Sequence, residues 1–138
     1  MIPTLPLNSK GEASMEERGG GIVVTAFANM LASESEHAAY HVIYRGEERF
    51  STTLHQVLHP GKRSEGHRHK EPELYFVIQG TLVLITEIRE IVAPAGTAIF
   101  VPGGVAHAVK NPSDDEPNVN IILMGVGFER GTEVPVEL

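Results

Sequence analysis

The chain has 138 residues, of which 41% are hydrophobic and 21% are charged. This length suits one domain with its own core, and the composition is that of a globular protein rather than a disordered chain. Eleven basic against eighteen acidic residues give a formal net charge of -7, which argues against nucleic acid or an anionic membrane as a partner. The lack of cysteine excludes disulfides and thiolate metal ligands. No apolar run has membrane-spanning length and no signal peptide is visible, so we expect a cytoplasmic protein.

Composition divides the chain into three segments. Residues 1–20 combine prolines, polar residues and a run of glycines, which is typical of an arm that is mobile or packs on a partner. Residues 21–128 alternate short apolar segments rich in Val, Ile, Thr, Phe and Tyr with glycine and proline, which predicts an all-β domain. Residues 129–138 are expected to form a C-terminal tail.

The expected strands follow the apolar segments of this domain. They span Ile22–Ala28, Tyr40–Tyr44, Phe50–Leu58, Leu74–Gln79, Leu82–Thr86, Glu90–Ala93, Ala98–Val101, Ala106–Lys110 and Asn118–Gly125. Only Ala28–Ala39 could form a helix, and its caps are poor. Asn111 is expected to tie its loop to the backbone.

Two segments carry the residues that a metal site needs. The first contains His67 and His69, followed by Glu73, and the second contains His107. Two histidines two apart on a strand can converge on one ion, Glu73 supplies a hard oxygen, and His107 arrives from a neighbouring strand. These ligands suit Fe(II), Mn(II), Ni(II), Co(II), Cu(II) or Zn(II), and ligand type alone does not choose among them. We therefore predict one divalent transition metal, with a closed structural site as the alternative.

The spacing around these residues resembles the two signature motifs of the cupin superfamily, small β-barrels of the jelly-roll type. The matching positions are Gly61, His67, His69, Glu73 and Gly80 in the first motif, and Gly96, Pro102, Gly104, His107 and Asn111 in the second. The short spacing between the motifs is similar to that of single-domain microbial cupins. The resemblance implies an all-β, single-domain cupin jelly-roll β-barrel over residues 21–128, with the three histidines and the glutamate holding one metal. Thr97 departs from the pattern, since many cupins carry Asp there, but it affects only a turn.

Strand alternation assigns two further residues to the cavity. Tyr75 shares the face of Glu73, so it is a candidate acid, base or substrate anchor, with an aromatic core residue as the alternative. Gln56 lies on the more apolar register of its strand and is a candidate substrate contact, although a register shift of one residue would put His55 there. His37, His41 and His59 have no partner pattern and are expected at the surface or an interface.

The pocket wall is expected to be small and mainly apolar. Its predicted residues are Leu54, Val109, Ile121 and Leu123. The opposite face of the strand after Glu73 carries Leu74, Phe76 and Ile78, and this apolar row needs cover, which predicts a homodimer.

Three functions are compatible with this site. One carboxylate against a dication leaves a formal charge of about +1, which favours a small anionic substrate. The leading hypothesis is an Fe(II)- or Mn(II)-type dioxygenase, an oxidoreductase in which the substrate chelates the metal. The second is a redox-neutral isomerase, lyase or decarboxylase, although Ser64 stands where oxalate decarboxylases typically carry Arg. The third is a non-catalytic small-molecule binding or sensing module.

Overall fold

A computed structural model describes residues 16–17, 23–24, 30–44, 51–129 and 131–138. Within these residues the regular elements are all strands. A membrane-spanning helix is therefore not found in this part of the chain. In chain order the strands are β1 (Glu16–Glu17), β2 (Val23–Val24), β3 (Leu31–Glu34), β4 (Ala38–Tyr44), β5 (Thr53–Leu58), β6 (His67–Arg68), β7 (Glu73–Gln79), β8 (Thr81–Thr86), β9 (Glu90–Pro94), β10 (Ala98–Val101), β11 (His107–Lys110), β12 (Asn118–Met124) and β13 (Val134–Pro135).

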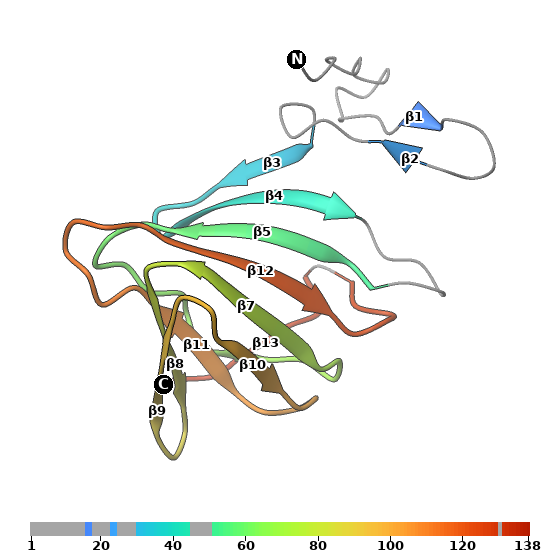
Figure 1. Cartoon of the computed structure of the whole chain (residues 1–138). Coiled ribbons are helices and arrows are strands. Elements are labelled where there is room, and N and C mark those ends of the chain that lie inside the picture. Colours follow the sequence, from blue (N-terminus) through green and yellow to red (C-terminus); the bar gives the residue numbers. More distant parts are fainter. Residues whose placement is uncertain (1–15, 18–22, 25–29, 45–50, 130) are drawn as a thin grey trace.

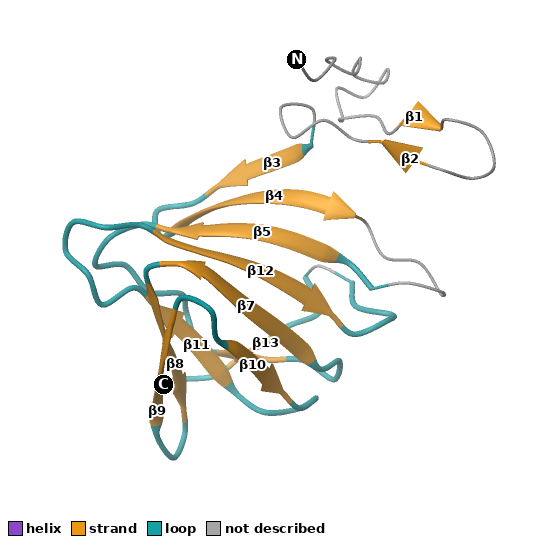
Figure 2. Ribbon diagram, in the orientation of Figure 1, coloured by secondary structure: helices purple, strands orange, loops and turns teal. Residues whose placement is uncertain are grey.

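Two antiparallel sheets form the body of the molecule (Figures 1 and 2). The large sheet has the order β10-β7-β12-β5-β4-β3, and the small sheet has the order β13-β6-β11-β8-β9. Side chains from both sheets meet in one core, in which Tyr75, Val77 and Ile122 of the large sheet join Leu82 and Leu84 of the small one. The predicted all-β jelly-roll is therefore confirmed.

Alternation along β7 explains why this segment forms a strand at the core. Glu73, Tyr75 and Val77 are buried, whereas Phe76 and Ile78 on the other face are 39% and 59% exposed. Burial of every second side chain favours a strand with one buried face. The predicted orientation of this strand is therefore correct.

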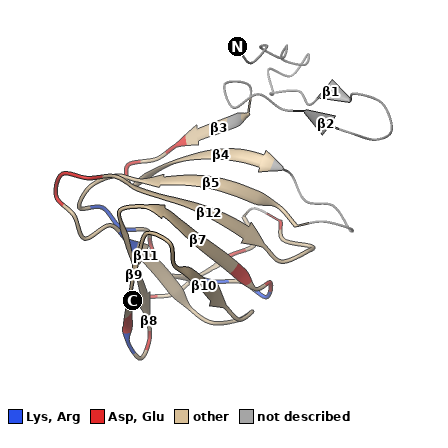
Figure 3. Cartoon of the chain, viewed as in Figure 1, with Lys and Arg blue, Asp and Glu red and all other residues tan. Residues whose placement is uncertain are grey.

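The charged residues lie mostly at the ends of the strands and in the loops (Figure 3). The strands β4, β5 and β12 contain no Asp, Glu, Lys or Arg. The middle of the large sheet therefore presents uncharged residues on both of its faces.

A helix over Ala28–Ala39 is wrong for the part of this range that the structure describes. Leu31–Glu34 is strand β3, and β4 begins at Ala38. Ser35 closes the turn between them: its N–H donates to the carbonyl of Ala38 at 2.8 Å, and its hydroxyl accepts the N–H of Ala38 at 3.2 Å. This tight hairpin turn competes successfully with a helix that lacks caps.

Several expectations at the N-terminal side fall on residues that the structure does not describe. Of the predicted arm, only Glu16–Glu17 is described, and it pairs with Val23–Val24. Ile22 and residues 25–28 of the first predicted strand, and Phe50 of the third, lie outside the described residues.

The loops that frame the two motifs have the expected geometry. The four motif glycines have positive φ, from 69° at Gly61 to 85° at Gly96, a region that glycine enters without steric cost. Asn111 is 1% exposed, and its amide donates to the carbonyls of Leu58 at 3.1 Å and Glu116 at 2.7 Å. The prediction that Asn111 ties its loop to the backbone is confirmed.

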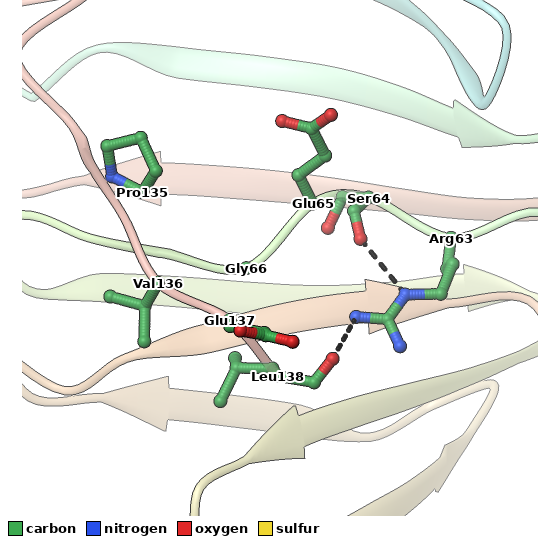
Figure 4. A pocket seen from close by; sticks show the side chains of 8 residues that line it. All are labelled: Arg63, Ser64, Glu65, Gly66, Pro135, Val136, Glu137 and Leu138. Atoms are coloured by element: carbon green, nitrogen blue, oxygen red, sulfur yellow. Dashed lines mark hydrogen bonds between the residues drawn. The ribbon is translucent and has the colours of Figure 1, made fainter.

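The C-terminal segment extends the small sheet. In β13, Pro135 pairs with His67, and beyond it the N–H of Val136 donates to the carbonyl of Gly66 at 2.9 Å. Leu138 packs on a small core cluster of the small sheet, and its carbonyl accepts a hydrogen bond of 3.3 Å from the guanidinium of Arg63 (Figure 4). We call residues 134–138 the C-terminal strap, because they bind the strand that carries His67.

Candidate metal centre

The four predicted ligand residues come from both sheets. His67 lies in β6 directly opposite His107 of β11, and His69 follows β6 by one residue. Glu73 is the first residue of β7 in the large sheet. One donor atom from each of these residues lies within 4.8 Å of the other three. The jelly-roll therefore brings together four side chains that are distant in sequence.

Each histidine is oriented by a backbone carbonyl two residues away. The Nδ1 atoms lie 3.3 Å from the carbonyl oxygen of Glu65 for His67, 2.7 Å from that of Glu71 for His69, and 2.8 Å from that of Val105 for His107. A ring that donates from Nδ1 to a carbonyl keeps the lone pair of Nε2 for a metal. With their rings held in this way, Nε2 of His69 and Nε2 of His107 both face Oε1 of Glu73, and a ring nitrogen of His67 lies within 4.8 Å of the other donor atoms.

A buried carboxylate lies at the centre of these rings. Glu73 is 4% exposed, and its Oε1 lies 2.5 Å from Nε2 of His69 and 2.9 Å from Nε2 of His107. Burial alone would raise the pKa of Glu73, but the hydrogen bonds from His107 and His69 outweigh it and hold this pKa well below its usual range. Glu73 is therefore ionised at neutral pH and places a negative charge among the imidazoles.

The same environment acts in opposite directions on two of the histidines. Burial lowers the pKa of His67, and the neighbouring His107 lowers it further. Burial also lowers the pKa of His69, but the hydrogen bond and the charge of Glu73 outweigh this and raise it. A metal ion replaces a proton in such a cluster, because its charge can interact with Glu73 and all three rings at once.

The donor set fits one divalent transition metal. Metal–ligand distances of about 2.1 Å place opposite ligand atoms about 4.2 Å apart, close to the spread of 4.8 Å found here. Three neutral nitrogens and one carboxylate oxygen suit the imidazole- and carboxylate-binding metals and do not distinguish among them. His67, His69, Glu73 and His107 would hold this ion.

A cavity of about 570 Å³ opens beside the cluster, a volume within the range of small-molecule sites. Its apolar wall consists of Val42, Leu54, Val109, Ile122, Met124 and Phe128. Tyr75 and Gln56 also line it. The sequence predicted four of these lining residues, namely Leu54, Val109, Tyr75 and Gln56. Of the four ligand residues, His67, His69 and Glu73 line the same cavity.

The predicted wall residues Ile121 and Leu123 were wrong. Burial alternates along β12, and the inward positions there are Ile122 and Met124. The buried face of β12 also carries Asn118 and Asn120. The opposite face carries Val119, Ile121 and Leu123, which are all apolar, and an apolar pattern favours that face for the core. The NH2 groups of the asparagines are satisfied, because Asn120 donates to Oδ1 of Asn118 at 2.7 Å and Asn118 donates to the carbonyl of Gln79 at 3.1 Å, while Oδ1 of Asn120 is buried without a hydrogen-bond partner among the described residues.

The cavity also contains a polar end that the sequence did not predict. His37, Tyr40 and Ser35 line it, and the hydroxyl of Tyr40 lies 3.1 Å from Nε2 of His37. Alternation along the predicted strand Tyr40–Tyr44 was the available signal for Tyr40. His37 was expected at the surface or an interface because the hairpin turn that directs it inward was not recognised.

The chain matches the family model described as a cupin domain over residues 54–123, about half of its length. No curated protein matches it. Similar solved structures include the polyketide cyclase RemF from Streptomyces resistomycificus, with 16% identity, a TM-score of 0.69 and coverage of 83% of this chain and 85% of that one. An RmlC-like cupin from Shewanella frigidimarina also has 16% identity, with a TM-score of 0.67 and coverage of 83% and 96%.

A further similar structure is oxalate decarboxylase from B. subtilis, with 16% identity and a TM-score of 0.62. The match covers 80% of this chain but only 31% of that one. At these identities the similarity concerns the fold alone. The family match, the two motifs and the jelly-roll agree, and the chain belongs to the cupin family.

Proposed function

We propose that this protein is a metal-dependent enzyme that acts on a small organic anion. The observation that carries the proposal is the position of the ligand cluster: His67, His69 and Glu73 line the same 570 Å³ cavity as the apolar wall and the polar end. A bound divalent ion supplies Lewis acidity and, with four protein ligands, open coordination positions for a substrate. A closed structural site would not need such a cavity.

The cavity wall restricts the substrate. Most of its surface is apolar, and Phe128 packs its ring against His69 with centroids 5.3 Å apart. Two further carboxylates, Glu129 and Glu133, line the cavity as well. They repel additional negative charge, so the favoured substrate carries one anionic group for the metal and a small apolar body for the wall.

Two reaction classes use such a site. Dioxygenase chemistry is supported by the open coordination positions and by an apolar wall through which dioxygen can reach them. Redox-neutral proton transfer is supported by Tyr40 and His37, which line the same cavity and carry groups that can move a proton. We favour the second class because a dioxygenase does not require these groups.

Metal analysis and an oxygen electrode test this proposal. Protein purified without added metal is expected to contain about one divalent transition metal per chain. Iron-loaded protein mixed with a panel of 2-oxo acids and phenolic acids is expected to bind one of them without substrate-dependent dioxygen uptake. Uptake in proportion to substrate would establish the dioxygenase instead, and a full-length protein that binds no metal would contradict the proposal.

We also propose that the outer face of the large sheet binds a second copy of the chain. Phe76, Ile78 and Phe100 are 39%, 59% and 63% exposed on neighbouring strands, and an apolar area of this kind favours association. Sedimentation is expected to give a dimer for the wild type, and Phe76→Asp is expected to shift it towards monomer at least tenfold in dissociation constant. A monomeric wild type would contradict this proposal, while Glu90→Gln on the exposed edge strand is the control.

A further inference from the structure

A second carboxylate is buried next to the ligand cluster. Glu71 belongs to the loop between β6 and β7, yet its side chain is only 5% exposed. Its Oε2 is buried and accepts no hydrogen bond from the described part of the chain. Burying a carboxylate in this way costs free energy, and such groups often mark a functional site or a bound ion.

The backbone on both sides of Glu71 is held by glycines of two other loops. On one side, a Cβ on Gly103 would lie 2.1 Å from the carbonyl oxygen of Lys70, so only a glycine lets the two loops approach this closely. On the other side, the N–H of Gly125 donates to the carbonyl of Pro72 at 2.7 Å. This close packing fixes the loop that carries Glu71 and keeps its side chain away from solvent.

The carboxylate of Glu71 lies on the Nδ1 side of the ligand His69. Its Oε2 is 4.0 Å from this Nδ1, which is already within 2.7 Å of the backbone carbonyl oxygen of Glu71. On the other side of the ring, Nε2 of His69 faces Oε1 of Glu73. Glu71 lies outside the lining of the cavity. It can therefore act on the ligand cluster by its charge, through the ring of His69, without touching a molecule in the cavity.

The lysine that pairs with Glu71 neutralises it only weakly. Nζ of Lys70 lies 3.9 Å from Oε1 of Glu71, but the Lys70 side chain is 90% exposed, so water screens this pair. Glu73, two residues further on, is buried as well and carries the same sign of charge. The two carboxylates repel each other in the metal-free protein, whereas a dication at the ligand cluster attracts both.

We infer that Glu71 is a positioning residue of the metal centre, and that its carboxylate strengthens the binding of divalent cations by adding a second buried negative charge beside His69. The inference rests on the proposed function, because the charge has this effect only where a dication binds at the cluster. Together, Glu71 and Glu73 cancel the two positive charges of such an ion. A protein interior holds an ion more tightly when its charge is balanced by nearby groups.

Glu65 is the matched residue at the neighbouring ligand. It stands two residues before His67, as Glu71 stands two residues after His69, and its backbone carbonyl oxygen lies 3.3 Å from Nδ1 of its own histidine. The side chain of Glu65 is exposed, whereas that of Glu71 is buried. Replacing each glutamate with glutamine therefore removes one charge close in sequence to a ligand histidine, in solvent at one position and in the interior at the other.

Competition with a chromophoric chelator tests the inference on the full chain, with Zn(II) and Mn(II) as the probes. Glu71→Gln is expected to lower the affinity for both ions about tenfold or more, the usual effect of losing a partner of a ligand histidine. Glutamine has the size of glutamate, so the loop stays filled and the charge alone is lost. Glu65→Gln is expected to keep the wild-type affinity within about twofold, because water and salt screen its charge.

The stability of the metal-free protein separates the effect of charge from that of structure. In EDTA, Glu71→Gln removes one of two buried like charges, so its free energy of unfolding in urea is expected to equal or exceed that of the wild type. A residue that only supports the loop would behave differently, because stability and metal affinity would fall together. Glu71→Asp keeps the charge and is expected to bind Zn(II) more tightly than Glu71→Gln does.

The possible failures of the inference and of the proposed function are distinct. Wild-type affinity in Glu71→Gln, or an equal loss in Glu65→Gln, overturns the role of Glu71 alone. The same conclusion follows if the metal-free Glu71→Gln protein is less stable than the wild type, or if Glu71→Asp binds Zn(II) no better than Glu71→Gln. A wild type that binds neither Zn(II) nor Mn(II) overturns the proposed function instead.

Discussion

Replacing Glu73 with glutamine is expected to lower the affinity for a divalent transition metal more than about 100-fold. Glu73 supplies the single carboxylate of the cluster, and its oxygen lies within hydrogen-bonding distance of two of the three ligand imidazoles. Loss of a partner that only orients a ligand already costs about 10- to 100-fold in affinity, so loss of the charged ligand itself costs more.

Glutamine is the appropriate replacement because it separates charge from shape. The amide has the size of the carboxylate, and its oxygen can still accept a hydrogen bond from His69 or His107. The buried site therefore stays filled and no cavity forms. The expected loss is confined to metal affinity, while the fold of the protein is retained.

Calorimetric titration with Zn(II) and Mn(II) and elemental analysis of the purified variant measure the effect. Glu90→Gln, at an exposed position of β9, makes the same chemical change outside the cluster and is expected to keep the wild-type metal content. Wild-type affinity in Glu73→Gln would show that the metal, where one binds, lies elsewhere in the chain.

The ligand cluster could be predicted from the sequence because its residues sit at fixed spacings between glycines. Gly80 and Gly104 have positive φ, and such positions constrain where each strand begins and ends. With strand ends fixed, alternation determines the face of each ligand. Alternation within the first motif also put Tyr75 in the cavity, and the more apolar register of the strand before the motif put Gln56 there, as the structure does.

The register of β12 could not be predicted by the same means. The choice depended on whether Asn118 and Asn120 or the apolar Ile121 and Leu123 face inward, and an apolar preference selects the second set. The side-chain NH2 groups of both asparagines find acceptors, Asn118 Oδ1 for Asn120 and, for Asn118, the carbonyl of Gln79 on another strand. Partners that are distant in sequence are not visible in a local hydrophobic pattern.

The polar end of the cavity was missed for a related reason. His37 faces Tyr40 because the turn at Ser35 folds β3 back on β4, and the sequence before β4 was considered a candidate helix. The missed turn therefore concealed His37. Tyr40 lay in the predicted strand Tyr40–Tyr44, whose alternation was an available signal for its inward position.

Replacing Gly66 with alanine is expected to release the C-terminal strap from β6. Gly66 does not have positive φ, so alanine introduces no backbone strain there. Its Cβ, however, would lie 2.2 Å from the carbonyl oxygen of Val136 and 2.9 Å from the side chain of Leu138. Such overlap with a backbone atom cannot be relieved by a rotamer change, and forced overpacking costs about 1–3 kcal/mol.

The release is expected to reach the metal centre through His67. Pro135 of the strap pairs with His67, and Gly66 precedes it directly, so movement of the strap changes the position of this ligand. We expect Gly66→Ala to lower the free energy of unfolding by about 2 kcal/mol and the metal affinity about tenfold or more. Urea unfolding and calorimetric titration measure the two effects, and hydrogen exchange at the amide of Val136 reports the strap itself.

Glu65→Ala is the matched control for this experiment. Glu65 is exposed, and the contact it makes with His67 uses its backbone carbonyl, which alanine retains. The control is therefore expected to keep the wild-type stability, metal affinity and protection of Val136. If Gly66→Ala exposes Val136 but binds metal as tightly as the wild type, then β6 holds His67 without the strap, and the pairing with β11 alone fixes this ligand.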